Sequence, residues 1–288
     1  MRFKQNIPAL QKSNLCRETQ ARAGWPWWGL SLLIFVAGPN FARAVPPLVT
    51  DDPGTAEKAQ FELFTGLEYL SEDHSITRHV PAFELDYGVT DRLQLTFAIP
   101  YVSTQGTNGF GDVTLELKYN FLKDQRKLPN ASLTFEWTLP TASFSRGLGS
   151  GADAYFIHLP LEKTWGRFTA LADFGYTIVG EPSLNGEREA RKNTWVIGFA
   201  QKYQLAKRTN LLSEIYWETS DEPSKPSAFA ASIGVEREIV KDFCLQAAVG
   251  RSLRDDARGG PDLRVYVGVH WFFDAPWKRS DTEKGDRK

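Results

Sequence analysis

Charged side chains recur at every second position in several segments of the chain. Glu84 and Asp86 are separated by one apolar residue, and so are Glu116 and Lys118. In an extended strand this spacing places the charges on one face and the apolar residues on the other. Ionised groups cannot sit in a dry apolar core, so they need water or one another. The chemistry this face could perform is electrostatic selection of dissolved molecules.

Acidic residues dominate this face. If the apolar face contacts lipid, the inward acids are Glu62, Glu68, Glu84, Asp86, Asp112, Glu116, Glu136, Glu162, Asp173, Glu214, Glu218, Glu236 and Asp262, and the inward bases are Arg92, Lys118, Lys202 and Arg264. The residues predicted to line the narrowest part are Glu84, Asp86, Glu116, Lys118, Glu136, His158 and Arg264. Two interpretations stay open: a hydrated path that disfavours anions, or a salt-bridged filling that keeps the structure rigid.

Motifs of covalent catalysis and metal binding are not found. Neither HExxH nor CxxC spacing occurs among the four histidines and two cysteines, so no metal site and no cofactor are predicted. No G-x-S-x-G motif occurs, and Ser213, on an apolar face, has no histidine neighbour in the expected arrangement. We therefore expect a protein that is not an enzyme, with an outer-membrane lipid-modifying enzyme as an alternative.

The elements that must position these groups are predicted to be β-strands, because apolar and polar residues alternate with a period of two. One such run has Leu93, Leu95, Phe97, Ile99 and Tyr101 on its apolar face. Twelve segments show this alternation, near 60–70, 79–89, 92–101, 111–122, 131–139, 153–163, 167–179, 194–204, 209–218, 227–238, 242–251 and 262–273. Most have about 10 residues, the length that crosses an outer membrane with tilt.

Connections and aromatic residues favour a membrane barrel over a soluble sheet. Short connections such as Thr90-Asp91 alternate with long ones such as 140–152, as in outer-membrane barrels. Aromatic residues such as Trp137 and Tyr176 lie near strand ends on the apolar face, where membrane interfaces would be. The predicted fold class is all-β, an antiparallel up-and-down transmembrane β-barrel of about 12 strands. A periplasmic β-sandwich or soluble barrel is the alternative.

Composition excludes several classes of protein. Of the 288 residues, 42% are apolar and 24% are charged, which excludes an intrinsically disordered chain. The formal net charge is -1, without the basic excess of a nucleic-acid-binding protein. No run of about 18 apolar residues occurs, so a helical membrane protein is also excluded.

The chain divides into four predicted regions. Residues 1–44 combine basic residues, an apolar stretch at 25–37 and an Ala-Arg-Ala site, which is typical of a secretory signal peptide. Residues 45–59 are predicted to be a periplasmic lead-in, 60–273 the outer-membrane barrel, and 274–288 a charged disordered tail. As an alternative for the lead-in, Asp51 and Asp52 would enter the lumen as a small plug and meet Lys or Arg there.

Several segments resemble one family of outer-membrane proteins. The run from Leu48 to Glu57, followed by Gln60-Phe61-Glu62-Leu63, is similar to the opening of the transporters named for the meta-pathway of phenol degradation. Tyr87 to Leu95 looks like the first periplasmic turn of this family, and Gly111-Asp112 with Leu117-Lys118-Tyr119 resembles a later strand. The similarity extends from about residue 48 to residue 273.

The resemblance implies a barrel in the bacterial cell outer membrane that passes small hydrophobic or aromatic molecules. Taken with the residues, it predicts a passive channel or transporter that needs no cofactor. The expected partners are outer-membrane lipid and lipopolysaccharide, a small-molecule solute and the barrel-assembly machinery, and no nucleic acid. A structural or adhesive barrel without transport is the alternative. The tail beyond Phe273 departs from the family pattern, in which the barrel ends at or near a terminal aromatic residue.

Overall fold

The structure is a computed structural model, and it describes residues 47–72, 75–104, 106–123, 128–184, 186–254 and 260–278. The predicted signal peptide at 1–44 lies outside these residues, as does most of the predicted tail. Nearly all regular structure in the described residues is β-strand. No helix among them is long and apolar enough to cross a membrane.

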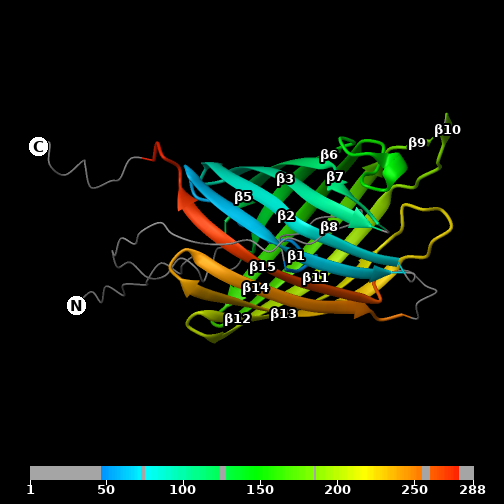
Figure 1. The fold of residues 1–288 in the computed structure, drawn as a ribbon. Coiled ribbons are helices and arrows are strands. Elements are labelled where there is room, and N and C mark those ends of the chain that lie inside the picture. The colour runs from blue at the N-terminus through cyan, green and yellow to red at the C-terminus, as the bar shows by residue number, and fades with distance from the viewer. Residues whose placement is uncertain are drawn as a thin grey trace, which may run out of the picture.

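Long antiparallel strands form a closed barrel (Figure 1). They are β1 (Gln60–Glu72), β2 (Ser75–Thr90), β3 (Leu93–Thr104), β5 (Val113–Leu122), β6 (Asn130–Leu139), β7 (Ala154–Trp165), β8 (Phe168–Val179), β11 (Thr194–Ala206), β12 (Thr209–Glu218), β13 (Ala228–Val240), β14 (Phe243–Ser252) and β15 (Leu263–Asp274). Each pairs with its neighbours in chain order, and β1 pairs with β15 to close the ring. The described chain thus confirms the predicted 12-strand antiparallel barrel.

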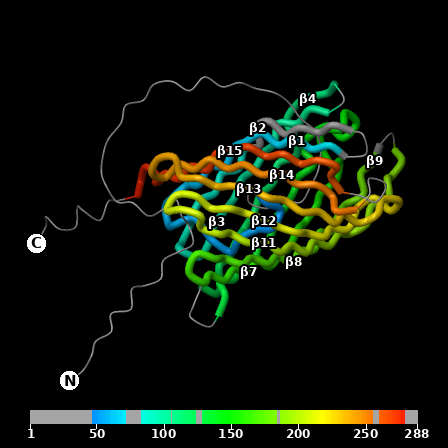
Figure 2. The backbone as a smooth tube through the Cα atoms, turned by 90° about the horizontal axis from the view of Figure 1, so that it is seen from below, coloured from blue at the N-terminus to red at the C-terminus, as the bar shows by residue number. Residues whose placement is uncertain are grey.

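Four short elements lie in the longer connections and were not predicted from the alternation. Strand β4 (Thr107–Phe110) folds back on the end of β3, and β9 (Ser183–Leu184) pairs with β10 (Glu187–Arg188). A single 3-10 turn, η2, covers Phe144–Arg146. Figure 2 shows the β9 connection extending beyond the end of the barrel. These pieces contain only two to four residues, too few for a period of two to be recognised.

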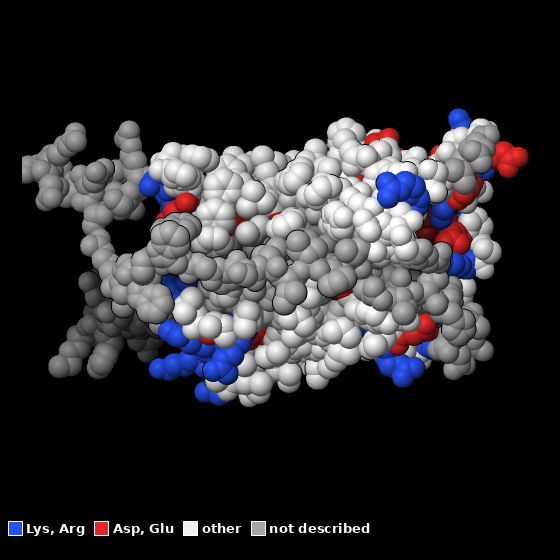
Figure 3. All heavy atoms as spheres, viewed as in Figure 1, with Lys and Arg blue, Asp and Glu red and all other residues white. Residues whose placement is uncertain are grey.

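The pleat of each strand separates apolar side chains outside from polar side chains inside. On β3, Leu95 and Phe97 are each 46% exposed, whereas Thr96 between them is buried. On β5, Leu117 is exposed and Lys118 is buried. On the face drawn in Figure 3, acidic and basic side chains gather at the two ends of the barrel and the middle is largely uncharged. The predicted outward orientation of the apolar face is confirmed, and a lipid bilayer requires such an uncharged band.

Candidate functional site

The segment that precedes β1, residues 47–59, lies inside the barrel, and we call it the plug. Asn120 Nδ2 on β5 donates a hydrogen bond to the Pro53 carbonyl at 2.8 Å. Gln94 Oε1 on β3 accepts one from the Ala56 N–H at 2.8 Å. The described part of the segment predicted as a periplasmic lead-in, 45–59, follows the inner wall, because that wall carries the partners for its backbone polar groups. The segment thus lies where the plug alternative placed Asp51 and Asp52.

One carboxylate on β12 anchors the first residues of the plug. Glu214 Oε2 accepts hydrogen bonds from the N–H of Val49 at 2.8 Å and from the N–H of Thr50 at 2.9 Å. Arg264 on β15 reaches the same stretch, since its Nη1 donates to the Pro47 carbonyl at 3.2 Å. Hydrogen bonds from backbone N–H groups to a buried carboxylate are stronger than neutral ones. This end of the plug is therefore fixed to the wall through its backbone.

Two lysines of the wall pair with the two aspartates of the plug. Lys118 Nζ lies 2.8 Å from Asp51 Oδ2, and Lys202 Nζ lies 3.4 Å from Asp52 Oδ2. Burial raises the pKa of Asp51 to about 6, although the Lys118 ammonium acts in the opposite direction. Burial also disfavours ionisation of Asp52, but the ammonium groups of Lys202 and Lys118 outweigh it and lower the pKa of Asp52 below its ordinary value.

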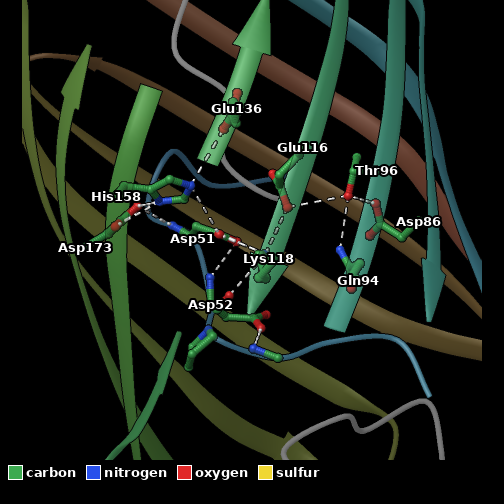
Figure 4. Close-up of polar contacts among 12 residues, drawn as sticks. Asp51, Asp52, Asp86, Gln94, Thr96, Glu116, Lys118, Glu136, His158 and Asp173 are labelled. Carbon is green, nitrogen blue, oxygen red and sulfur yellow. Dashed lines mark hydrogen bonds and ion pairs between the residues drawn. The ribbon is translucent and has the colours of Figure 1, made fainter. Parts of the chain in front are cut away.

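A second cluster surrounds His158 on β7, next to the plug (Figure 4). Its Nδ1 lies 3.1 Å from both carboxylate oxygens of Asp173 on β8. Its Nε2 faces the other way and lies 3.7 Å from Glu136 Oε1 and 4.0 Å from Asp51 Oδ2. One ligand atom each of Glu116, Glu136 and His158 lie within 4.8 Å of one another, so these residues could hold a metal ion.

The seven residues predicted to line the narrowest part do not form one group. The structure brings Glu116, Lys118, Glu136 and His158 together beside Asp51. Asp86 is linked to them by the hydroxyl of Thr96, whose Oγ1 lies 2.6 Å from Asp86 Oδ1 and 3.4 Å from an oxygen of Glu116. Glu84 is half-buried further along β2, and Arg264 belongs to the anchor of the first plug residues.

Sequence reasoning placed several plug contacts on the inward face without recognising their role. Glu214, Lys202 and Asp173 were all predicted to point inward, and each contacts the plug or the His158 cluster. Asn120 was placed on the polar side of its strand without a function. The alternation shows which face a side chain occupies. It does not show at what height along the barrel another segment will meet that side chain.

The alternative of a lipid-modifying enzyme required a serine next to a histidine. Ser213 Oγ instead accepts a hydrogen bond from Gln201 Nε2 at 2.8 Å in an exposed setting. His158 Nε2 has no hydrogen-bond partner among the described residues, and the carboxylates of Glu136 and Asp51 lie 3.7 and 4.0 Å from it. In this part of the chain Nε2 therefore forms no hydrogen bond to a nucleophilic hydroxyl.

Several solved structures of outer-membrane proteins are similar to this chain. The chain is similar in structure to the COG4313 outer membrane channel from Pseudomonas putida F1, with 15% identity, a TM-score of 0.63, and coverage of 80% of this chain and 100% of that one. It is also similar to the NanC porin (11% identity, TM-score 0.54, 73% and 98% covered) and the KdgM porin (9%, 0.52, 74% and 99%). No curated protein matches the sequence significantly.

A family profile matches most of the chain. The profile carries the description "Putative MetA-pathway of phenol degradation", and it matches residues 47–263, which include the plug and all barrel strands except β15. The match begins at the first described residue, so the plug belongs to the family's pattern and is not an addition to it. Because it covers well over half of the 288 residues, the chain belongs to the Putative MetA-pathway of phenol degradation family.

Proposed function

We propose that this protein is a passive channel of the bacterial outer membrane and that the plug restricts its lumen. The observation that carries the proposal is the inward face, where buried ionisable side chains of the wall pair with the plug while apolar side chains face outward. A barrel needed only as a rigid body has no requirement for a separate polar segment in its lumen. A segment held by hydrogen bonds and ion pairs is removable, because water can replace these partners.

The proposed solute is a small aromatic or hydrophobic molecule. This class comes from the family description, which refers to phenol degradation, and from the similarity to proteins named as an outer membrane channel and porins. The lumen of this chain adds a charge preference. Carboxylates outnumber ammonium groups around the plug, so anions should pass less readily than neutral or cationic molecules.

The channel proposal is tested by displacing the plug without changing any charge. A Cβ atom at Gly198 on β11 would lie 2.5 Å from Thr50 Oγ1, so Gly198→Val places a side chain where the plug sits. Ala172→Val, on the lipid-facing side of neighbouring β8, is the control. In planar bilayers we expect Gly198→Val to raise the mean single-channel conductance and Ala172→Val to leave it unchanged.

The same experiment separates the channel from the structural barrel. If folded wild-type protein and folded Gly198→Val are both non-conducting, the barrel has no path and the proposal fails. Heat-modifiable gel mobility establishes folding, since a folded barrel resists unfolding in detergent until it is boiled.

In a KCl gradient, Glu116→Gln combined with Glu136→Gln should reduce the preference for cations, because both carboxylates line the lumen.

A further inference from the structure

The orientation of His158 is the starting point for a second function of the lumen wall. The ring is almost fully buried, and Asp173 occupies its Nδ1 at 3.1 Å. A carboxylate in that position orients the ring, so that Nδ1 donates to Asp173 and Nε2 points toward Glu136 and Asp51. Nε2 has no hydrogen-bond partner among the described residues. A buried polar atom without a hydrogen bond destabilises the folded state, so a ligand that bound to Nε2 would offset that cost.

The groups in front of Nε2 are acceptors, which cannot donate a hydrogen bond to it. Glu136 Oε1 lies at 3.7 Å and Asp51 Oδ2 at 4.0 Å. Both distances are too long for a hydrogen bond from a protonated imidazole. They suit atoms that share one metal ion better, because two ligands bound to tetrahedral zinc at about 2.0–2.1 Å are about 3.4 Å apart. A shift of a few tenths of an ångström would bring Glu136 Oε1 from 3.7 Å to that separation from Nε2.

The local charge also favours a cation. Four carboxylates, those of Asp51, Glu116, Glu136 and Asp173, surround His158 and its neighbour Lys118. The ammonium of Lys118 lies 2.8 Å from Asp51 and 3.9 Å from Glu116, so one positive charge is shared among these acids. A divalent ion at Nε2 would neutralise more of this charge than a single proton would.

We propose that Glu116, Glu136 and His158 bind one divalent transition-metal ion of the zinc class, with Asp173 as the residue that orients the histidine. One imidazole and two carboxylates suit zinc, whereas magnesium and calcium take oxygen ligands alone. Asp51 Oδ2 lies 4.0 Å from Nε2, and as a fourth ligand it would join the plug to β5, β6 and β7. The three ligands come from three different strands, so they form no local spacing motif in the sequence.

The second inward histidine provides a matched control. His270 on β15 is also buried and also pairs with a carboxylate, since its Nε2 lies 3.0 Å from Glu62 Oε2. Here the hydrogen bond occupies the nitrogen that would bind a metal, and the ring packs between Phe64 and Phe272 at centroid distances of 3.7 and 4.0 Å. His270→Gln therefore removes a buried lumen histidine of similar burial without touching the proposed site.

The proposal is tested by titrating the folded, detergent-solubilised full barrel with Zn²⁺ against a chromophoric chelator, after metal has been removed. We expect one Zn²⁺ per chain, a loss of affinity of at least about 100-fold for His158→Gln and for Glu136→Gln, and about 10- to 100-fold for Asp173→Asn. Asp51→Asn should weaken binding by about 10-fold, the low end of that range. His270→Gln should bind as the wild type does.

Two results would overturn the metal site. In one, the folded wild type binds no Zn²⁺ at micromolar concentration. In the other, the wild type, Glu136→Gln and His158→Gln bind Zn²⁺ with equal affinity. If His158→Gln does not fold, Glu136→Gln and Asp173→Asn still decide the outcome. Co²⁺ provides a second readout, because its absorption spectrum reports a tetrahedral nitrogen and oxygen environment directly. None of these measurements requires conductance, so the metal site and the channel can fail independently.

Discussion

Two groups of ion pairs join segments that are distant in the sequence, one inside the lumen and one in the long connections at the end of the barrel. In the lumen, Lys118 and Asp51 approach to 2.8 Å, and their side chains are 2% and 3% exposed. In the connections, Arg191 and Asp221 approach to 3.1 Å, and their side chains are 17% and 42% exposed. The separations are alike, so burial is what distinguishes them.

The difference in burial decides what each group can do. Water and salt screen the exposed pairs around Arg191, and such pairs contribute little to stability. Water cannot solvate the buried Lys118–Asp51 pair while the plug stays in place. Losing one partner there leaves an uncompensated charge. The plug contacts are therefore the ones through which a substitution should change the lumen.

The largest effect is expected from Lys118→Met, which deletes the ammonium shared by the plug and the wall. Asp51 would remain buried and Glu116 half-buried without it, and breaking a buried pair costs about 3–5 kcal/mol. We expect the plug to leave its seat and the denaturation midpoint of the barrel in detergent to fall. Lys241→Met, at an exposed turn position, is the control. Equal shifts for the two variants would contradict the role given to burial.

A smaller effect is expected from Glu214→Gln. The amide keeps the shape of the side chain and one acceptor oxygen, but it loses the negative charge and replaces the other oxygen, which accepts from Val49, with an NH₂ donor. Hydrogen bonds to a charged group are worth about 1.5–3 kcal/mol, so we expect a loss of about 2–3 kcal/mol in plug docking. Hydrogen exchange of the amides in residues 47–59 should become faster. Glu222→Gln, in an exposed pair with Lys225, should leave that exchange unchanged.

The sequence predicted the barrel much better than it predicted the plug, and the reason lies in the range of the contacts. Alternation is a local property, so the strand predicted at 92–101, observed at Leu93–Thr104, and its outward face follow from neighbouring residues alone. The plug depends on partners far along the chain. Asp51 is 67 residues from Lys118, and Thr50 is 164 residues from Glu214. No pattern within residues 47–59 records these distances.

The grouping of the lumen residues shows the same limit. A period of two assigned both Glu136 and Arg264 to the inward face, but it contains no coordinate along the barrel axis. The register between strands supplies that coordinate, for example Glu116 opposite Glu136 across β5 and β6. The His158 cluster therefore appears only once three strands are aligned.

Alanine substitutions at two glycines compare the plug with a long connection through steric effects alone, because no charge changes. A Cβ atom at Gly88 on β2 would collide with the backbone carbonyl of Glu57 in the plug, and backbone cannot move aside cheaply. At Gly109, in a long connection, it would meet only the methyl end of Leu148 at 3.0 Å. We expect Gly88→Ala to cost about 1–2 kcal/mol and Gly109→Ala less, measured as denaturation midpoints in detergent. The reverse order would show that the plug adapts more easily than the connection.

The smallest effect is expected from Arg191→Ala, which removes the centre of the exposed group. Arg191 pairs with Glu189 at 2.9 Å and with Asp221 at 3.1 Å, and each carboxylate is more than two-fifths exposed. Water can solvate both acids after the substitution, so the change should stay below about 1 kcal/mol. It should shrink further at 1 M salt, where screening extends over about 3 Å. Hydrogen exchange of the plug should not change. A loss of stability as large as that of Lys118→Met, and independent of salt, would contradict this comparison. It would mean that Arg191, despite its partial exposure, is as poorly hydrated in the folded barrel as Lys118.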